Sequence, residues 1–126
     1  MANDPATVVE QAYAAVDRAD ADALIALLAD DVEMADEVTK GWLRGTVAVA
    51  AYLRDALAGL SGIRSEVRDV AVRELGDTAV VSYAVTQRYP IDGALATVAG
   101  PGTVVLRRVA GGWRIALIQS TPFPAD

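Results

Sequence analysis

The chain has 126 residues, 53% of them apolar, carries a net charge of −6, and contains neither cysteine nor histidine. Without those two residue types, disulfides, thiolate nucleophiles, Ser–His triads and histidine-ligated metals are excluded. The arginines are scattered and form no basic patch, so we do not expect the protein to bind nucleic acid. No apolar run reaches the roughly 20 residues that span a bilayer, so we do not expect it to associate with a membrane.

The N-terminal residues predict a helix rather than a signal peptide. Asp4 can cap such a helix and Pro5 suits its first turn, whereas a signal peptide would carry a basic stretch and an apolar run. We therefore expect a cytoplasmic protein. The apolar side chains that follow share one helical face, at Val8, Val9, Ala12, Tyr13 and Val16.

A second, shorter helix is predicted after the polar residues 17–20. Asp20 or Asp22 is its expected cap, because a short polar side chain can accept a hydrogen bond from the first turn. Its inward side chains are expected to be Leu24, Leu27 and Leu28. The aspartate pair 30–31 should end this helix, and the alternation over residues 32–34 predicts a short strand.

Residues 36–45 are predicted to form a loop that leads into a third helix. Thr46 can cap this helix, and Gly59 and Gly62 are suited to end it. Its core-facing side chains, at helical spacing, are Val49, Leu53, Ala56, Leu57 and Leu60.

From residue 63 onward the period changes to two, which predicts strands over residues 63–74, 78–89, 95–109 and 113–121. The first strand contains a slip, because Val67 is odd-numbered whereas Val70 and Val72 are even-numbered. One inserted residue explains the slip, so we expect a bulge near Arg68 or Asp69 that bends the strand.

Turn residues separate the predicted strands. Gly76-Asp77 and Gly111-Gly112 suit tight hairpins, and Pro90 to Gly93 forms a further turn. The triplet Gly100-Pro101-Gly102 should break or bulge the third strand, because proline cannot donate a ladder hydrogen bond and glycine is weak in a strand.

Helices followed by a bent meander of strands predict an α+β fold. We expect three N-terminal helices packed on a curved mixed or antiparallel sheet, which forms a cone around an internal apolar pocket because bulges and glycine kinks curve a sheet. No repeat, low-complexity tract or linker interrupts residues 1–126, so the sequence predicts a single domain.

Four segments resemble the nuclear transport factor 2-like superfamily, which includes SnoaL-like cyclases and ketosteroid isomerases. They are residues 19–24 (Ala-Asp-Ala-Asp-Ala-Leu), 27–32 (Leu-Leu-Ala-Asp-Asp-Val), 41–45 (Gly-Trp-Leu-Arg-Gly) and 112–121 (Gly-Trp-Arg-Ile-Ala-Leu-Ile-Gln-Ser-Thr). The last segment looks most like the SgcJ/EcaC group. The resemblance implies a cystatin-like roll that encloses a small-molecule pocket. It also implies that the domain forms a homodimer through the outer face of its sheet.

The resemblance also implies one catalytic residue. Asp36 matches the general base of the ketosteroid isomerases, which lies just after the first strand. Their oxyanion hole is not matched here. Its tyrosine is off by one, with Ala12 at the matching position and Tyr13 beside it, and its protonated aspartate has no counterpart, because Gly102 or Thr103 stands there. Steroid isomerisation by that mechanism is therefore not predicted.

The residues themselves leave two interpretations of Asp36 open. A carboxylate at the mouth of an apolar pocket can exchange protons near neutral pH, because desolvation raises its pKa. The alternative is a solvated aspartate that caps the loop after the strand. We take Asp36 as the candidate catalytic residue.

Polar side chains on the predicted strands are candidate ligand contacts. Gln119 shares a strand face with Ile115 and Leu117, so it should point into the cone and could hydrogen-bond a carbonyl or hydroxyl. The alternative is a core amide bonded to backbone. The full set of predicted ligand-binding residues is Tyr13, Trp42, Tyr83, Gln87, Tyr89, Thr103 and Gln119.

Three functions are compatible with this sequence. The first is a SnoaL-like enzyme that uses Asp36 for cyclase, isomerase or hydratase chemistry on an apolar polyketide-, terpene- or steroid-like molecule. The second is a non-catalytic ligand-binding domain, and the third an oligomerisation domain. Neither a metal nor an organic cofactor is expected, and exposed apolar residues such as Val80, Val105 and Ile118 on the outer sheet face would support a dimer.

Overall fold

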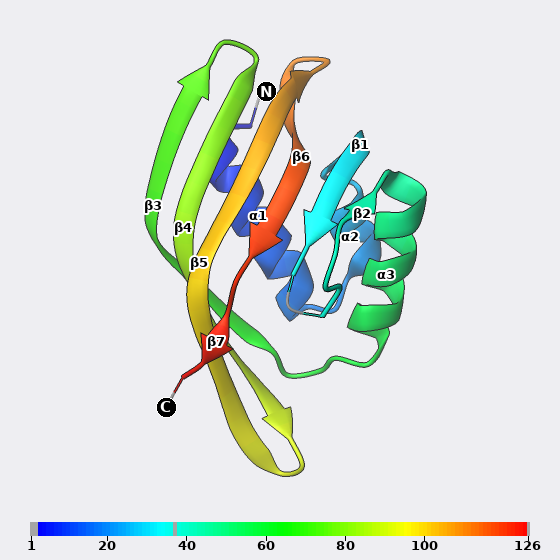
Figure 1. Cartoon of the computed structure of the whole chain (residues 1–126), viewed down its shortest axis with the longest axis vertical. Helices are drawn as coiled ribbons and strands as arrows, with labels where there is room; N and C mark the ends of the chain where they lie inside the picture. Colours follow the sequence, from blue (N-terminus) through cyan, green and yellow to red (C-terminus); the bar gives the residue numbers. More distant parts are fainter. Residues whose placement is uncertain (1–2, 37, 126) are drawn as a thin grey trace.

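A computed structural model describes residues 3–36 and 38–125, and these residues form three helices packed on one curved, seven-stranded mixed sheet (Figure 1). The helices are α1 (Pro5–Asp17), α2 (Ala21–Ile25) and α3 (Thr46–Ala58). The strands are β1 (Leu28–Ala35), β2 (Leu43–Arg44), β3 (Arg64–Leu75), β4 (Thr78–Ile91), β5 (Ala94–Val109), β6 (Gly112–Ser120) and β7 (Phe123–Pro124). The expected α+β fold is confirmed.

The strand order is β2-β1-β6-β5-β4-β3, with β7 paired to β5. β1 and β6 are parallel, and the other neighbouring strands are antiparallel. The helices cover one face of the sheet, and the hairpin of β4 and β5 extends past the end of α3 (Figure 1). The sheet is not closed into a barrel, which leaves the open cone that the sequence predicts.

The first helix forms as expected. The Asp4 carboxylate accepts a hydrogen bond from the Thr7 backbone N–H at 2.9 Å and so caps α1. Its apolar face is buried against the sheet, since Val8 and Val9 are at most 1% exposed. This burial, rather than helix propensity alone, stabilises a helix of this length.

The second helix is shorter than predicted. Asp20 caps it, but α2 ends at Ile25, and Leu28 begins β1 instead of lying on the helix. The aspartates at 30–31 therefore lie within a strand and do not end a helix. The reason is tertiary, because β1 pairs in parallel with β6, a strand more than 80 residues later that no local pattern can include.

The loop and the third helix also differ in detail. Two residues of the predicted loop form β2, which pairs with β1. Gly45, with φ +88°, stands at the N-cap of α3, and Thr46 lies inside the helix. The Thr46 hydroxyl donates instead to the backbone oxygens of Ala29 and Asp30, at 3.2 and 2.8 Å, which ties α3 to β1.

The predicted bulge in β3 is confirmed. The pairing with β4 shifts between Arg68 and Ala71, and Asp69 adopts φ +56°. The hairpin at 76–77 also forms as predicted. The turn predicted over Pro90 to Gly93 forms at its last two residues, Asp92-Gly93, because β4 continues to Ile91. The last hairpin is displaced by one residue, to Ala110-Gly111.

The prediction that Gly100-Pro101-Gly102 breaks the sheet is wrong. β5 pairs with β4 without interruption through all three residues. The carbonyl of Pro101 accepts a hydrogen bond from the Thr121 N–H at 3.0 Å and therefore faces away from β4. The nitrogen of Pro101 faces the same way, because the nitrogen and the carbonyl of one residue point to the same side of an antiparallel strand. The missing N–H is thus not needed in the β4 ladder.

Gly102 has a packing role that the sequence does not reveal. A Cβ at this position would overlap the ring of Tyr83 on the neighbouring strand. Glycine therefore leaves room for that ring in the core.

No helix formed by the described residues is long and apolar enough to cross a membrane.

Candidate functional site

A cavity of about 430 Å³ lies between the helices and the inner face of the sheet. Its lining is mostly apolar and comes from all three helices and from strands at both sides of the sheet. The helices and the segment after α3 contribute Ala12, Tyr13, Val16, Leu24, Val49, Tyr52, Leu53, Asp55, Ala56, Leu57, Leu60 and Ile63. The remaining lining residues are Leu28, Met34, Ala35, Asp36, Val38, Gln87, Tyr89, Val98, Ile115, Ile118 and Ser120.

Asp36 directly follows β1 and lines this cavity. Its Oδ1 atom accepts hydrogen bonds from the backbone N–H groups of Val38 and Thr39, both at 2.8 Å. These bonds form a turn of the kind that aspartate commonly stabilises after a strand. The half-buried carboxylate is therefore fixed in place by the backbone of its own loop.

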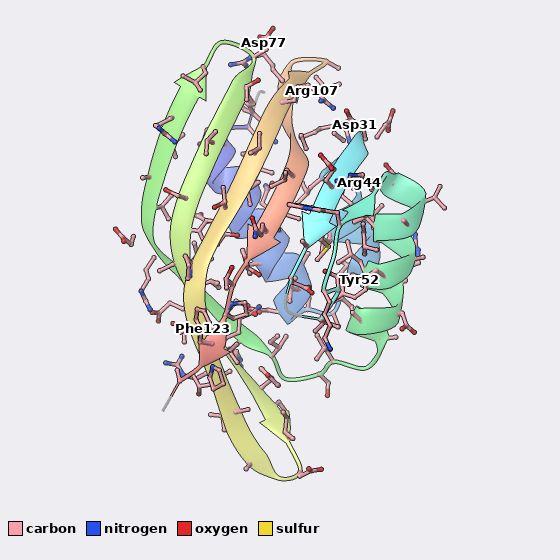
Figure 2. All side chains as sticks on the ribbon, viewed as in Figure 1. Asp31, Arg44, Tyr52, Asp77, Arg107 and Phe123 are labelled. Carbon is pink, nitrogen blue, oxygen red and sulfur yellow. The ribbon has the colours of Figure 1, made fainter. Side chains whose placement is uncertain are left out.

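The second carboxylate oxygen of Asp36 is bonded from a different element. The hydroxyl of Tyr52, a residue on α3 that Figure 2 labels, donates to Oδ2 at 2.9 Å. Tyr52 also lines the cavity. The two side chains thus form a carboxylate–phenol pair, joined across 16 residues of sequence and placed at the cavity wall.

A second polar pair lies deeper. The hydroxyls of Tyr13 on α1 and Tyr83 on β4 are 2.8 Å apart, and their rings meet edge to face with centroids separated by 5.6 Å. Burial raises the pKa of Tyr83 to about 12, an effect that the hydrogen bond with Tyr13 partly opposes. Tyr13 lines the cavity, whereas Tyr83 lies behind it in the core.

A third polar group lies where α1 ends. Gln87 lines the cavity and donates through Nε2 to the Ser65 hydroxyl at 3.0 Å. Ser65, on β3, donates its hydroxyl and its backbone N–H to the carboxylate of Asp17, at 2.7 and 2.9 Å. Tyr89, two residues beyond Gln87 on the same strand, also lines the cavity.

Besides Tyr83, three more of the predicted ligand contacts do not line the cavity. Trp42 is 43% exposed and does not line the cavity. Thr103 and Gln119 pair with each other on the outer face of the sheet, and Gln119 is exposed. Gln119 contributes instead, with Asp36 and Thr121, to a smaller hollow of about 140 Å³ at the end of β6.

The expected inward orientation of Gln119 is wrong because β6 contains a bulge. Leu106 pairs with Ile115 and Val105 pairs with Leu117, which leaves Ala116 as an extra residue. An extra residue inverts the alternation that follows it. Ile118 therefore lines the cavity and does not lie on the outer face, where the sequence pattern places it.

Sequence reasoning missed three residues of these polar groups. Tyr52 carries the helical spacing of a core residue, and nothing local indicates its partner. Asp17 and Ser65 lie 48 residues apart in the chain. The available signal was an aspartate at the last position of a helix, where the helix dipole disfavours negative charge unless a partner compensates it.

Residues 3–36 and 38–125 hold no group of three or more acidic, histidine or cysteine side chains arranged to bind a metal ion. The polar side chains of the cavity can accept or donate hydrogen bonds, and Asp36 can accept a proton. The arrangement can therefore bind a mostly apolar molecule and present one carboxylate to it.

Comparison with known proteins identifies relatives of this chain. A family model described as the SnoaL-like domain matches residues 6–126. No curated protein matches the sequence.

Solved structures share the fold. One is a candidate dehydratase of the NTF2-like family from Streptomyces avermitilis, 23% identical, with a TM-score of 0.85 over 95% of this chain and 94% of that one. A ketosteroid isomerase-like protein from Erwinia carotovora atroseptica is 22% identical, with a TM-score of 0.77 over 94% and 92%. A cystatin-like protein of unknown function from Nostoc punctiforme is 17% identical, with a TM-score of 0.81 over 99% and 97%. At these identities the likeness establishes the fold alone.

Proposed function

The chain belongs to the SnoaL-like domain family, and from that membership we propose that it is an enzyme that binds an apolar small molecule in its cavity and moves a proton with Asp36. Candidate substrates are polyketide-, terpene- or steroid-like molecules. The observation that carries the proposal is the Asp36 carboxylate, held at a mostly apolar cavity wall by Tyr52. One relative of similar fold is named as a candidate dehydratase, which is compatible with proton-transfer chemistry.

One step that would serve cyclisation, isomerisation or dehydration of a carbonyl substrate in this cavity is removal of a proton next to the carbonyl. Asp36 would accept that proton, and the electron pair of the broken C–H bond would move into the carbonyl to give an enolate. The resulting carboxylic acid can return the proton to another carbon or to a departing hydroxyl, which leaves as water. The step requires no oxidant or reductant.

The fixed position of Asp36 is the main contribution of the protein to this step. Three hydrogen bonds hold the carboxylate, so little rotational freedom is lost when the substrate binds. Tyr52 would keep Oδ2 engaged and direct the remaining acceptor capacity of the group toward the cavity. Tyr13, Gln87 and Tyr89, which also line the cavity, are the proposed substrate-positioning residues.

The same hydrogen bonds favour a second candidate function. A carboxylate that caps its own loop through Val38 and Thr39 has a sufficient structural role without catalysis. The chain would then be a ligand-binding domain with the same cavity and no turnover.

We also propose that the protein is a cytoplasmic homodimer that associates through the outer face of the sheet. The half-buried side chains Val80, Val105 and Leu117 lie on that face and support the proposal. Membership of the SgcJ/EcaC group remains a prediction from the C-terminal segment.

Proton exchange tests the catalytic proposal without knowledge of the natural substrate. The bicyclic ketone 2-tetralone carries exchangeable protons next to its carbonyl, and their replacement by deuterium in heavy water is followed by NMR. Wild-type protein should accelerate the exchange above the buffer rate, and Asp36→Asn should reduce that acceleration about 100-fold, the usual contribution of a positioned general base.

The matched control is Asp55→Asn, because Asp55 is the other aspartate that lines the cavity and it is exposed. This variant should exchange protons at the wild-type rate. Binding of 2-tetralone with equal exchange by wild type and Asp36→Asn would establish the ligand-binding alternative. Equal losses in both aspartate variants would show a general effect of charge and would contradict the role of Asp36.

A further inference from the structure

The carboxylate of Asp17 lies at an electrostatically unfavourable position. Asp17 is the last residue of α1, where the helix dipole is negative and disfavours a second negative charge. Two hydrogen bonds from Ser65 compensate the carboxylate, one from the backbone N–H at 2.9 Å and one from the hydroxyl at 2.7 Å. The end of α1 is thereby joined to β3.

The hydrogen bonds between Asp17 and Ser65 determine which atom is the donor between Ser65 and Gln87. A carboxylate only accepts, so the single hydroxyl proton of Ser65 is directed to Asp17. The contact of 3.0 Å between Ser65 and Gln87 must then use an N–H of Gln87 as donor. The opposite amide orientation would place two acceptor oxygens against each other, so this chain of bonds fixes the side-chain amide of Gln87.

The fixed amide leaves its oxygen for another partner. None of the described residues donates to Oε1 of Gln87, and no polar side-chain atom buried in the described part of the chain lacks a partner. The oxygen is therefore accessible, and Gln87 lines the cavity. Val98 lies beside it on β5 and Ser65 on β3, so the surroundings of the amide on the sheet are set by the strand pairing.

We infer that Asp17 and Ser65 orient Gln87 as a specificity-determining acceptor, and that the ligand of this cavity is an apolar molecule carrying a hydroxyl group that donates to Gln87. This inference rests on the proposed function only in its use of the cavity as the ligand site. Asp36 is not involved, so the selectivity at Gln87 and the proton exchange at Asp36 can fail separately.

Three probes with the same ring system test the inference by calorimetry or ligand-observed NMR. 2-Naphthol has a hydroxyl donor, 2-methoxynaphthalene has an oxygen without a proton, and naphthalene has neither. Purely hydrophobic binding would favour the ether and the hydrocarbon. Wild-type protein should instead bind 2-naphthol about five- to tenfold tighter than 2-methoxynaphthalene, the usual effect of one hydrogen bond in a protein.

The variants separate the acceptor from the residues that orient it. Gln87→Met keeps the size of the side chain but removes the acceptor, and should abolish the preference for 2-naphthol. Ser65→Ala keeps Gln87 but lets its amide turn, so the preference should fall to about twofold while binding of the ketone 2-tetralone improves. Gln119→Met, on the outer face of the sheet, is the matched control and should retain the wild-type preference.

Each outcome decides the inference. Equal affinity of wild type for 2-naphthol and 2-methoxynaphthalene overturns it while leaving the cavity as a binding site. A preference that survives in Gln87→Met places the acceptor elsewhere and overturns it as well. Binding of none of the three probes overturns this inference, whereas the proposed function is decided separately by the proton exchange of 2-tetralone. Loss of the preference in Gln87→Met, with circular dichroism unchanged, supports the assignment.

Discussion

The two halves of β4 present the same alternation of side chains to the same face of the sheet, yet one half is core and the other is cavity wall. In the first half, Ala79, Val81 and Tyr83 are at most 4% exposed and belong to the hydrophobic core. In the second half, Gln87 and Tyr89 line the cavity. The strand itself does not change, because it pairs with β5 without interruption over its whole length.

The difference follows from where α1 ends. The helix covers the first half of the strand, and its last residue, Asp17, contacts Ser65, the β3 partner of Gln87. Beyond that point the strands continue into the protruding hairpin, and no turn of α1 lies over them (Figure 1). A cavity therefore forms where a sheet is longer than the helix packed on it, and polar residues are tolerated there because they are not sealed from water or ligand.

The largest effect on the free energy of unfolding is expected when one apolar residue from each half of β5 is truncated and the two losses are compared. Leu106→Ala should lower the free energy of unfolding by about 2–5 kcal/mol, because Leu106 is fully buried and the truncation leaves a void. Val98→Ala, at the cavity wall, should cost about 1 kcal/mol or less, since that side chain already borders empty space. Urea denaturation measures both, and equal losses would contradict the division into core and wall.

The second effect is a loss of stability at high pH, which we expect to originate from Tyr83 in the first half of β4, the half that belongs to the core. The pKa of Tyr83 is about 12 in the folded state and 10.0 in the ordinary phenol, so the folded protein holds a proton that the unfolded chain releases. The free energy of unfolding should therefore fall as the pH rises from 10 to 12, by roughly 3 kcal/mol in total.

Variants in each half identify the source of that decline. Tyr83→Phe removes the titrating hydroxyl and should flatten the dependence of stability on pH between 10 and 12. Tyr89→Phe, in the cavity half of the same strand, should retain it. A decline that is unchanged in Tyr83→Phe would assign the effect to other groups and would contradict the burial of this hydroxyl.

A smaller effect concerns the close approach between β4 and β5. Gly102→Ala should destabilise the protein by about 1–3 kcal/mol, because its Cβ would overlap the Tyr83 ring and force the ring or the strand to move. Gly41→Ala is the control, since a Cβ there meets no atom within 4 Å and the backbone φ is not in the left-handed region. Thermal denaturation of both variants measures the difference.

The smallest effect lies on the opposite face of the sheet. Arg107 on β5 pairs with Asp31 on β1, and its hydrogen bond lowers the pKa of that carboxyl (Figure 2). This contribution to stability is present above the ordinary carboxyl pKa and is lost as the pH falls through the lowered value. Because both side chains are largely exposed, Arg107→Ala should change stability less than Leu106→Ala, Tyr83→Phe or Gly102→Ala. An NMR titration should show the Asp31 pKa return upward, and an unchanged value would contradict the pairing.

Much of the fold could be predicted because its signals are local. Fewer than fifteen consecutive residues are enough to predict each of three features, which are the Asp4 helix cap, the buried face of α1 and the bulge at Asp69. Two predictions that failed depend on pairing partners far away in sequence. Leu28 joins a strand because β6 lies beside it, and Pro101 is harmless because its nitrogen faces away from β4.

The candidate site was predicted less completely for the same reason. Asp36 and Gln87 are recognisable as polar residues near apolar strands, and both line the cavity. Their partners are not recognisable, since Tyr52 looks like an ordinary helical core residue and Ser65 like an ordinary strand residue. The orientation of Gln119 failed because a single extra residue in β6 inverts the face of every residue after it.

The sequence by itself determined the order and type of most elements, the α+β class and the absence of histidine and cysteine chemistry, because these depend on composition and short-range periodicity. Only the tertiary structure decided which polar side chains meet. Asp36 with Tyr52, Tyr13 with Tyr83, and Asp17 with Ser65 are pairs formed by packing helices on a sheet. Such packing brings together residues 16 to 70 positions apart, and no local pattern of hydrophobicity specifies contacts at that separation.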